Sequence, residues 1–311
     1  MRFAIFGAGG VGGYFGGKLA QAGEDVTFIA RGDHLRAIRE RGLRVDSVLG
    51  GFVVNPAKAT DTPAEAGPLD VILLATKAWS VPEAIDKMKP LMNKDAFVIW
   101  LGNGIEPTDQ LVKAFGQEQV MGGLCRISSF IAGPGYIQHV GVTPYIAFGE
   151  LDRTHSQRAE NLRQIFARIP EIKTEVLPDI HIGLWEKFIF VAAVGGVGAV
   201  TRQPNGVFRS VPETRAMLIA TMEEILKIGR ARGVNLGVDV IKNVMTRNVD
   251  QSAPDVIASM HKAIVEGKPS ELDDQTGAIV RMGRQLGVPT PTNDFIYAAL
   301  LPMELKARGR I

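Results

Sequence analysis

Short, nearly continuous apolar runs alternate with amphipathic stretches through the first half of the chain. The apolar runs predict strands at 2–6, 25–30, 71–75, 96–101 and 120–124, and a further strand is expected near 173–176. Helical spacing predicts helices at 11–21, 80–88 and 156–168, and two strand-like pieces within 135–148 predict a hairpin or an edge addition. Apolar strands that alternate with helices are typical of a parallel sheet covered on both faces.

The pattern changes near Pro178, after which helical periodicity predominates. We expect helices at 180–194, 213–232, 238–248, 254–266, 271–286 and 293–308. The fold class that follows is α/β, with an N-terminal Rossmann doubly wound sheet over 1–178 and an all-helical C-terminal domain over 179–311. The first domain is the candidate NADP-binding domain, and the second is the candidate substrate and catalytic domain.

Two segments bear on targeting and membranes. The longest apolar run, 188–200, has thirteen residues, whereas a membrane-spanning helix needs about twenty. Lys18 lies where the cleavage region of an export signal is normally neutral, so we expect no export signal. We therefore expect a soluble, cytoplasmic protein.

The composition argues against nucleic-acid binding, membrane binding, internal disulfides and metal sites. The 35 Lys and Arg residues against 33 Asp and Glu leave a net charge of +2, which gives no basis for a nucleic-acid or membrane partner. The single cysteine, Cys125, excludes an internal disulfide and favours a reducing compartment. The five histidines are scattered without metal-ligand spacing, so no metal site is expected. The oligomeric state stays open, a homodimer included.

Seven of the 35 glycines fall within the first seventeen residues. The segment Gly7-Ala8-Gly9-Gly10-Val11-Gly12 fits G-x-G-x-x-G between an expected strand and an expected helix. In that pattern the glycines permit a tight turn, the approach of a pyrophosphate and close helix–strand packing. A tight turn beside a face of small residues is the alternative explanation.

The end of the second expected strand bears on the choice of cofactor. An NAD enzyme usually has an acidic residue there to hold the ribose hydroxyls. This chain has Arg31, which can bind a 2′-phosphate through two hydrogen bonds and therefore favours NADP. Asp33 keeps dual specificity open, and a solvated Arg31 at the start of a loop is the alternative.

Two charged residues of the second half are candidates for chemistry. Lys187 lies among large apolar side chains in LWEKFIF, where desolvation would depress its pKa and suit a general acid. The alternative is a lysine that snorkels from a helix boundary. Glu271 lies in PSELDD, where Ser270 and Asp273 resemble a helix-capping pair and leave Glu271 to face a cleft.

Two further candidates follow expected strands of the sheet. Asn103 comes just after the strand at 96–101, where its amide could hold the nicotinamide and a substrate carbonyl, or only form an Asn-Gly turn. Lys77 follows the strand at 71–75 and is placed for a phosphate or the substrate.

Taken in order, these motifs resemble the ketopantoate reductase (2-dehydropantoate 2-reductase) family over almost the whole chain. The motifs are GAGGVG at 7–12, ARG at 30–32, TKAW at 76–79, NG at 103–104, WEKF at 185–188, PNG at 204–206, SM at 259–260 and SELD at 270–273. The resemblance implies a Rossmann domain and a helical domain with the site between them. It also implies NADPH-dependent reduction of 2-dehydropantoate to pantoate in pantothenate biosynthesis.

The resemblance also implies roles for individual residues. Lys187 matches the lysine that gives the proton, and Glu271 matches the acid near substrate and cofactor ribose. Asn103 and Lys77 match cofactor-side and substrate-side contacts. Asn205 and Ser259 match polar groups that bind the hydroxyl and the carboxylate of the substrate.

The chain departs from the family at two positions. Members typically carry an asparagine four residues after the lysine and another four residues later, and here these positions are Val191 and Gly195. Loss of two amides changes specificity. A reductase of a more apolar 2-keto acid is therefore an alternative, and a non-catalytic NADPH-binding sensor is an alternative from another class.

Overall fold

The computed structural model describes all 311 residues of the chain, which divide into two compact units. The first unit comprises Met1–Gly102 and Pro107–Ile180. The second comprises Asn103–Glu106 and His181–Ile311.

An eight-stranded sheet forms the centre of the first unit. Its strands are β1 (Arg2–Phe6), β2 (Asp25–Ile29), β5 (Lys58–Thr60), β6 (Val71–Leu74), β7 (Phe97–Trp100), β8 (Val120–Arg126), β11 (Tyr145–Glu150) and β12 (Lys173–Val176), in the order β12-β11-β8-β7-β6-β1-β2-β5. Pairing is parallel from β5 through β8, and β11 is antiparallel to β8. The order from β5 to β8 is that of a Rossmann sheet, as predicted.

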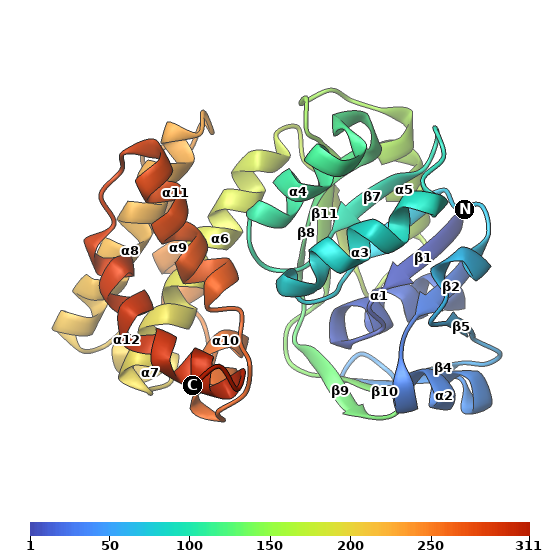
Figure 1. Cartoon of the computed structure of the whole chain (residues 1–311), viewed down its shortest axis with the longest axis horizontal. Coiled ribbons are helices and arrows are strands. Elements are labelled where there is room, and N and C mark those ends of the chain that lie inside the picture. Colours follow the sequence, from blue (N-terminus) through green and yellow to red (C-terminus); the bar gives the residue numbers. More distant parts are fainter. The chain divides into compact units, whose positions relative to one another are not determined.

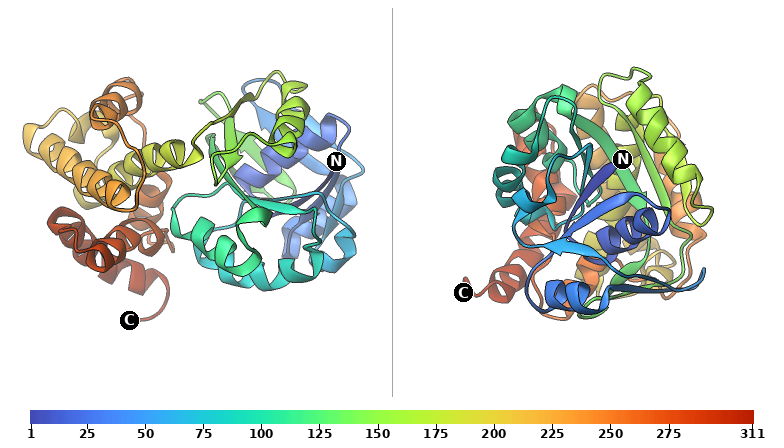
Figure 2. Two further views of the ribbon diagram at one scale, coloured as in Figure 1. Left: turned by 90° about the horizontal axis from the view of Figure 1, so that it is seen from above. Right: turned by 90° about the vertical axis from the view of Figure 1, so that its right-hand side faces the viewer.

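Helices cover both faces of this sheet, which is why β6 and β7 are buried throughout. The helices α3 (Val81–Met88) and α4 (Glu106–Phe115) lie in front of it in Figure 1. The helices α1 (Gly10–Gln21) and α5 (Gln157–Ala167) lie on the other face (Figure 2), where the rings of Phe15 and Phe166 are 6.5 Å apart.

A second, four-stranded sheet packs on α1. It comprises β4 (Phe52–Val54), β3 (Leu43–Ser47), β10 (Tyr136–His139) and β9 (Ser129–Gly133) in that order. The predicted hairpin within 135–148 is therefore wrong, because β10 pairs with β9 and β3 whereas β11 joins the large sheet. The sequence also gave no sign of α2 (Gly32–Arg41), since that helix is predominantly polar.

The second unit consists of helices, as predicted. They are α6 (Ile180–Thr201), which enters from the first unit, α7 (Asn205–Phe208), α8 (Pro212–Ala231), α9 (Val240–Val244), the π-helical turn η5 (Met245–Asp250), α10 (Ser259–Val265), the π-helical turn η6 (Asp273–Gly277), α11 (Ala278–Leu286) and α12 (Pro291–Ala307). Short 3₁₀ turns of the chain lie at Pro63–Ala66, Ala78–Ser80, Lys89–Leu91 and Gln117–Gln119.

Helices α6 and α10 differ in length from the predicted helices at 180–194 and 254–266. Helix α6 continues through the glycines at 195, 196 and 198, because they pack closely against Met260, Ile296 and His261. Helix α10 begins at Ser259, five residues after the predicted start. The intervening loop instead accepts hydrogen bonds from the first backbone N–H groups of α7.

Helix α6 is also longer than the apolar run seen in the sequence. By length and composition alone its 22 residues could cross a membrane, and 67% of its most apolar window is buried inside the structure. A core helix of a globular unit has the same composition. The packing of α6 against the other helices accounts for its apolar character.

Candidate functional site

The glycine turn between β1 and α1 has the geometry of a phosphate cradle. Gly7 has φ +93°, and a Cβ added there would lie 2.9 Å from the Ala75 carbonyl oxygen. A Cβ at Gly12 would lie 2.1 Å from the Gly7 carbonyl oxygen, so helix and turn are in direct contact. At Gly9, the N-cap of α1, a Cβ would meet nothing within 4 Å, and no side chain caps the helix. The first N–H groups of α1 thus remain for an anion.

Two basic side chains lie at the same edge of the sheet as this turn. Arg31 follows β2 and Lys77 follows β6, and both are exposed. Because β2, β1 and β6 are adjacent and parallel, their carboxyl ends share one edge. The residues present therefore fit a dinucleotide, with backbone N–H groups for the pyrophosphate and two cations beside them.

Arg31 has a partner that a phosphate could replace. Its Nη2 lies 2.8 Å from Oε1 of Glu83, and the two side chains are 65% and 51% exposed. Hydrogen bonding from Lys87 and the charge of Arg31 lower the pKa of Glu83, so it is a carboxylate at neutral pH. Exposed ion pairs are weak. Arg31 can therefore exchange this carboxylate for a more highly charged phosphate.

The segment that carries Glu271 is fixed from α12. The Ser270 hydroxyl donates to Oε2 of Glu304 at 2.5 Å, and the Ser270 N–H donates to the same oxygen at 3.0 Å. Arg308 donates to Oε1 of Glu304 at 2.6 Å and to the Ser270 carbonyl oxygen at 2.8 Å. The predicted capping pair of Ser270 with Asp273 is not formed, since the Ser270 hydroxyl accepts from the Leu272 N–H instead.

Acidic side chains cluster around Glu271, which is only 3% exposed. Asp273 pairs with Arg281 at 2.9 Å and accepts a hydrogen bond from Tyr297 at 2.8 Å. Asp274 is half-buried, and its Oδ2 has no hydrogen-bond partner. Desolvation, with the charges of Glu271 and Asp273, raises the pKa of Asp274 to about 6. Asp274 therefore titrates near pH 6.

One face of α6 carries the candidate proton donor. Lys187 is half-buried, and positions 187, 191 and 195 share a face because helical residues four apart are neighbours. A Cβ added at Gly195 would lie 3.0 Å from Cε of Met260 and 3.6 Å from Oε1 of Gln275. The face that begins at Lys187 thus ends against α10 and η6.

The remaining candidates lie in loops and helix starts. Asn205 is buried at the start of α7, and its Nδ2 donates to the Val249 carbonyl oxygen at 3.0 Å and to the Ser252 hydroxyl, while its Oδ1 has no partner. Ser259 is exposed at the start of α10. Asn103 lies in the loop after β7, half-buried and followed by Gly104 with φ +101°.

The structure thus gathers the predicted residues in two groups. The glycine turn, Arg31 and Lys77 share an edge of the sheet. Lys187, Asn205, Ser259 and Glu271 lie in the helical unit together with Asp274 and Gln275, which the sequence analysis missed. The signal for the last two was their polarity directly before the amphipathic helix α11.

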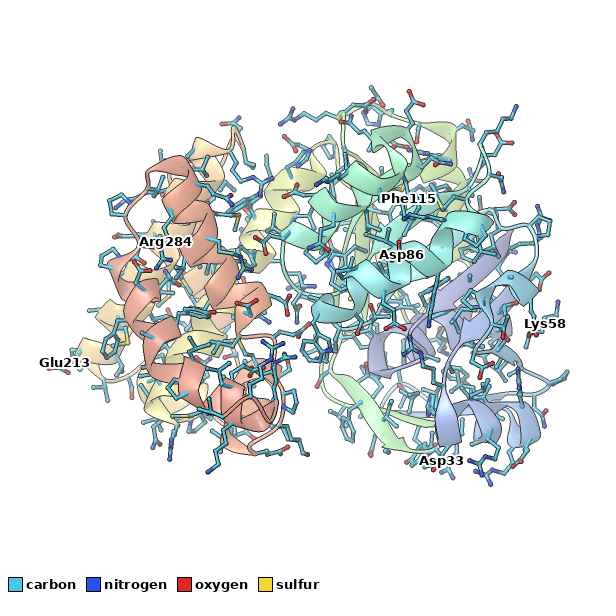
Figure 3. The ribbon with its side chains drawn as sticks, viewed as in Figure 1. Asp33, Lys58, Asp86, Phe115, Glu213 and Arg284 are labelled. Carbon is cyan, nitrogen blue, oxygen red and sulfur yellow. The ribbon has the colours of Figure 1, made fainter.

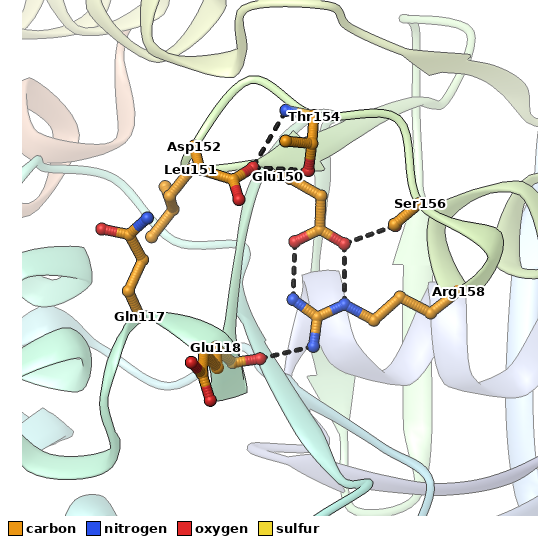
Figure 4. Close-up of a pocket in the computed structure, with 8 residues that line it drawn as sticks. All are labelled: Gln117, Glu118, Glu150, Leu151, Asp152, Thr154, Ser156 and Arg158. Atoms are coloured by element: carbon orange, nitrogen blue, oxygen red, sulfur yellow. Dashed lines mark hydrogen bonds and ion pairs between the residues drawn. The ribbon is translucent and has the colours of Figure 1, made fainter.

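A pocket of the first unit lies away from the glycine turn. It has a volume of about 290 Å³ and is lined by residues between Gln117 and Arg158 (Figure 4). Arg158 donates to both carboxylate oxygens of Glu150 and to the Glu118 carbonyl oxygen, and Ser156 donates to Glu150. These groups satisfy one another, and none of the predicted site residues lines the pocket.

Several charges on the surface of the first unit are paired with opposite charges. Asp33, Lys58 and Asp86 lie on its outside (Figure 3). Arg36 pairs with Asp33, and Lys58 pairs with Asp25 at 2.7 Å. The surface thus mixes both signs of charge where these residues lie.

Comparison with known proteins places these features in context. Residues 3–153 match the family model described as ketopantoate reductase PanE/ApbA, and residues 179–304 match its C-terminal counterpart. The chain is 30% identical to an uncharacterized oxidoreductase, YkpB, of Bacillus subtilis over 96% of this chain and 98% of that protein. It is 28% identical to a 2-dehydropantoate 2-reductase of Pyrococcus horikoshii over 99% of both chains. A crystal structure of a PanE/ApbA family ketopantoate reductase from Ralstonia eutropha JMP134 is similar with TM-score 0.87, 32% identity, and coverage of 99% of this chain and 100% of that one.

Proposed function

The chain belongs to the ketopantoate reductase family and is an oxidoreductase that acts on CH–OH groups, and on this premise we propose that it reduces a 2-oxo acid with NADPH. The substrate we propose is 2-dehydropantoate, reduced to pantoate in pantothenate biosynthesis. The observation that carries the proposal is the uncapped glycine cradle at the start of α1 with Arg31 at the next strand end. Cytoplasmic location is part of the proposal, supported by the single, buried Cys125.

The choice of NADPH depends on Arg31. A guanidinium can bind the 2′-phosphate through two hydrogen bonds, whereas an NAD enzyme usually has a carboxylate at this place. Gly7 to Gly12 would hold the pyrophosphate through their backbone, and Lys77 would add a positive charge beside it.

In the proposed reaction the bound cofactor supplies a hydride to C2 of the keto acid. The Lys187 ammonium gives its proton to the oxygen of the same carbonyl, so that the C=O group becomes CH–OH. Glu271 and Asn103 orient the reactants. Asn205 retains an unpartnered Oδ1 that can accept the substrate hydroxyl, and Ser259 is assigned to the carboxylate.

Substitution of Lys187 tests its proposed role as the proton donor. We expect Lys187→Ala to lower kcat by about 10²–10⁴-fold, the usual contribution of a general acid, while NADPH affinity is unchanged. Lys227→Ala is the matched control, because Lys227 is an exposed lysine of α8 in the same unit. An unchanged kcat in Lys187→Ala would remove this residue from its role.

Substitution of Arg31 tests the proposed preference for NADPH over NADH. Arg31→Asp should lower the ratio of kcat/KM for NADPH to that for NADH, because a carboxylate repels the 2′-phosphate. Arg36→Asp is the matched control on the same helix, with a side chain that is also exposed. A ratio that does not move in Arg31→Asp would refute the phosphate assignment.

A second candidate function has one observation in its favour. Val191 and Gly195 carry no amide on the face of α6 that begins at Lys187, which suits a more apolar 2-keto acid. Turnover of branched keto acids but not of 2-dehydropantoate would support this candidate. Tight NADPH binding without turnover of any keto acid would support a non-catalytic NADPH-binding sensor. It would overturn the proposal that the protein reduces 2-oxo acids.

A further inference from the structure

Gln275 is the most completely buried polar side chain of the helical unit with no partner. It is 0% exposed, and neither its Oε1 nor its Nε2 has a hydrogen-bond partner. A buried amide without partners costs stability, because its polar atoms have given up water without gaining a hydrogen bond. Other buried amides of the unit are used, since Asn293 donates to Glu224 at 2.6 Å. Gln275 therefore has an amide kept for something outside the protein's own hydrogen bonds.

The position of Gln275 relates it to both candidate chemical groups. Its backbone N–H donates to the Glu271 carbonyl oxygen at 2.9 Å, so the two residues are one helical turn apart on one face of the segment. Its Oε1 lies 3.6 Å from the place of a Cβ at Gly195, on the face of α6 that begins at Lys187. The amide of Gln275 is thus directed to the face of α6 that carries Lys187, one helical turn along its own segment from Glu271.

We propose that Gln275 binds a hydroxyl group on the chain of the 2-oxo acid and so determines specificity for hydroxylated substrates. This inference rests on the proposed function. An amide with a free donor and a free acceptor complements a group that both donates and accepts, and a hydroxyl is such a group. A carboxylate only accepts, so the amide is not matched to the acid end.

The distance from Lys187 supports this assignment. Gly195 lies eight residues beyond Lys187, which is about 12 Å along the helix axis. Gln275 is therefore too far from Lys187 to act on the reacting carbonyl, and we assign it to the other end of the substrate chain. It supplies from η6 the amide that α6 lacks at position 195, so the apolar face of α6 does not imply an apolar substrate.

The test compares two acids that differ by one hydroxyl. These are 4-hydroxy-3,3-dimethyl-2-oxobutanoate, which is 2-dehydropantoate, and 3,3-dimethyl-2-oxobutanoate. We expect Gln275→Met, which keeps the side-chain length, to lower kcat/KM for the hydroxylated acid about 10–100-fold. For the other acid the change should be less than about threefold, because no hydrogen bond is lost.

Thr276→Val is the matched control. Thr276 is the next residue, it is equally buried, and its hydroxyl also has no partner, but it faces Gly196 and not Gly195. The ratio of the two kcat/KM values should not change in this variant. Gln275→Leu gives a second apolar replacement if Gln275→Met does not fold.

Restoring an amide from α6 provides a rescue. In Gln275→Leu, the added substitution Gly195→Asn should recover part of the lost preference, since the nearest atom to the new Cβ is the mobile Cε of Met260. If Gln275→Met lowers kcat/KM for both acids equally, the inference is wrong while the proposed function stands. If the unsubstituted enzyme reduces neither these acids nor other 2-oxo acids, the proposed function is overturned and the inference with it.

Discussion

Asp274 should destabilise the folded helical unit at neutral and alkaline pH. The pKa of this carboxyl is raised from 3.8 to about 6, first by desolvation and then by the charges of Glu271 and Asp273. The folded state therefore binds the proton more tightly than the unfolded state. The destabilisation is absent below about pH 4, grows as the pH rises toward 6, and is complete above it.

The magnitude follows from the two pKa values. A difference of about two pH units corresponds to ~3 kcal/mol, at about 1.4 kcal/mol for each unit. This value is an upper limit for two reasons: Asp274 retains some exposure, and an asparagine in its place would also lack a partner for one polar atom. We therefore expect a stabilisation of about 1–3 kcal/mol on substitution. Asp274→Asn should raise the free energy of unfolding by this amount at pH 8 and by almost nothing at pH 4.

Urea denaturation followed by circular dichroism at a series of pH values measures this difference. Asp255→Asn is the matched control, because Asp255 is an exposed aspartate of the same unit and its charge is not among those that raise the pKa of Asp274, so its loss should give no gain at pH 8. A gain of equal size at pH 4 and pH 8 would refute the reasoning, since it could not come from the titration of Asp274.

Three further substitutions test the cradle and the segment before Glu271. Gly12→Ala should lower the free energy of unfolding by about 2 kcal/mol or more, because its Cβ would lie 2.1 Å from the Gly7 carbonyl oxygen; an unchanged urea midpoint would contradict this. Gly9→Ala should keep the midpoint, since its Cβ meets nothing within 4 Å, but weaken NADPH binding in a fluorescence titration; full affinity would show that the cofactor does not approach there. Glu304→Gln should lower kcat together with the melting temperature, because Ser270 loses a charged acceptor, and a lower melting temperature with wild-type kcat would show that Glu304 does not position Glu271.

The sequence predicted most of the fold because its strong signals were local. Strand β1 agrees with the predicted strand 2–6, since buried parallel strands are almost continuously apolar. The predicted strand 173–176 also agrees with β12, although its residues alternate between exposed and half-buried. The small sheet was missed because β3 and β10 are distant in sequence and pair only in the folded chain. The glycines of α6 look like helix breakers until their packing partners are known.

The sequence named candidate residues for the site but could not indicate their contacts. A pattern with defined spacing identified Gly7 to Gly12, and the order of short motifs identified Lys187 and Glu271. Gln275 could not be found this way, because its importance lies in lacking a partner and in facing Gly195 across two elements. Such a property belongs to the packed state alone.

The hydrogen bonds of Ser270 have a consequence for the order of folding. Its partners Glu304 and Arg308 lie 34 and 38 residues further along the chain. Helix α12 must therefore dock before the segment with Glu271 becomes rigid, and closing so long a loop is slower than forming a helix. During refolding, helical structure should return before enzymatic activity does, with an interval during which the chain is helical but inactive.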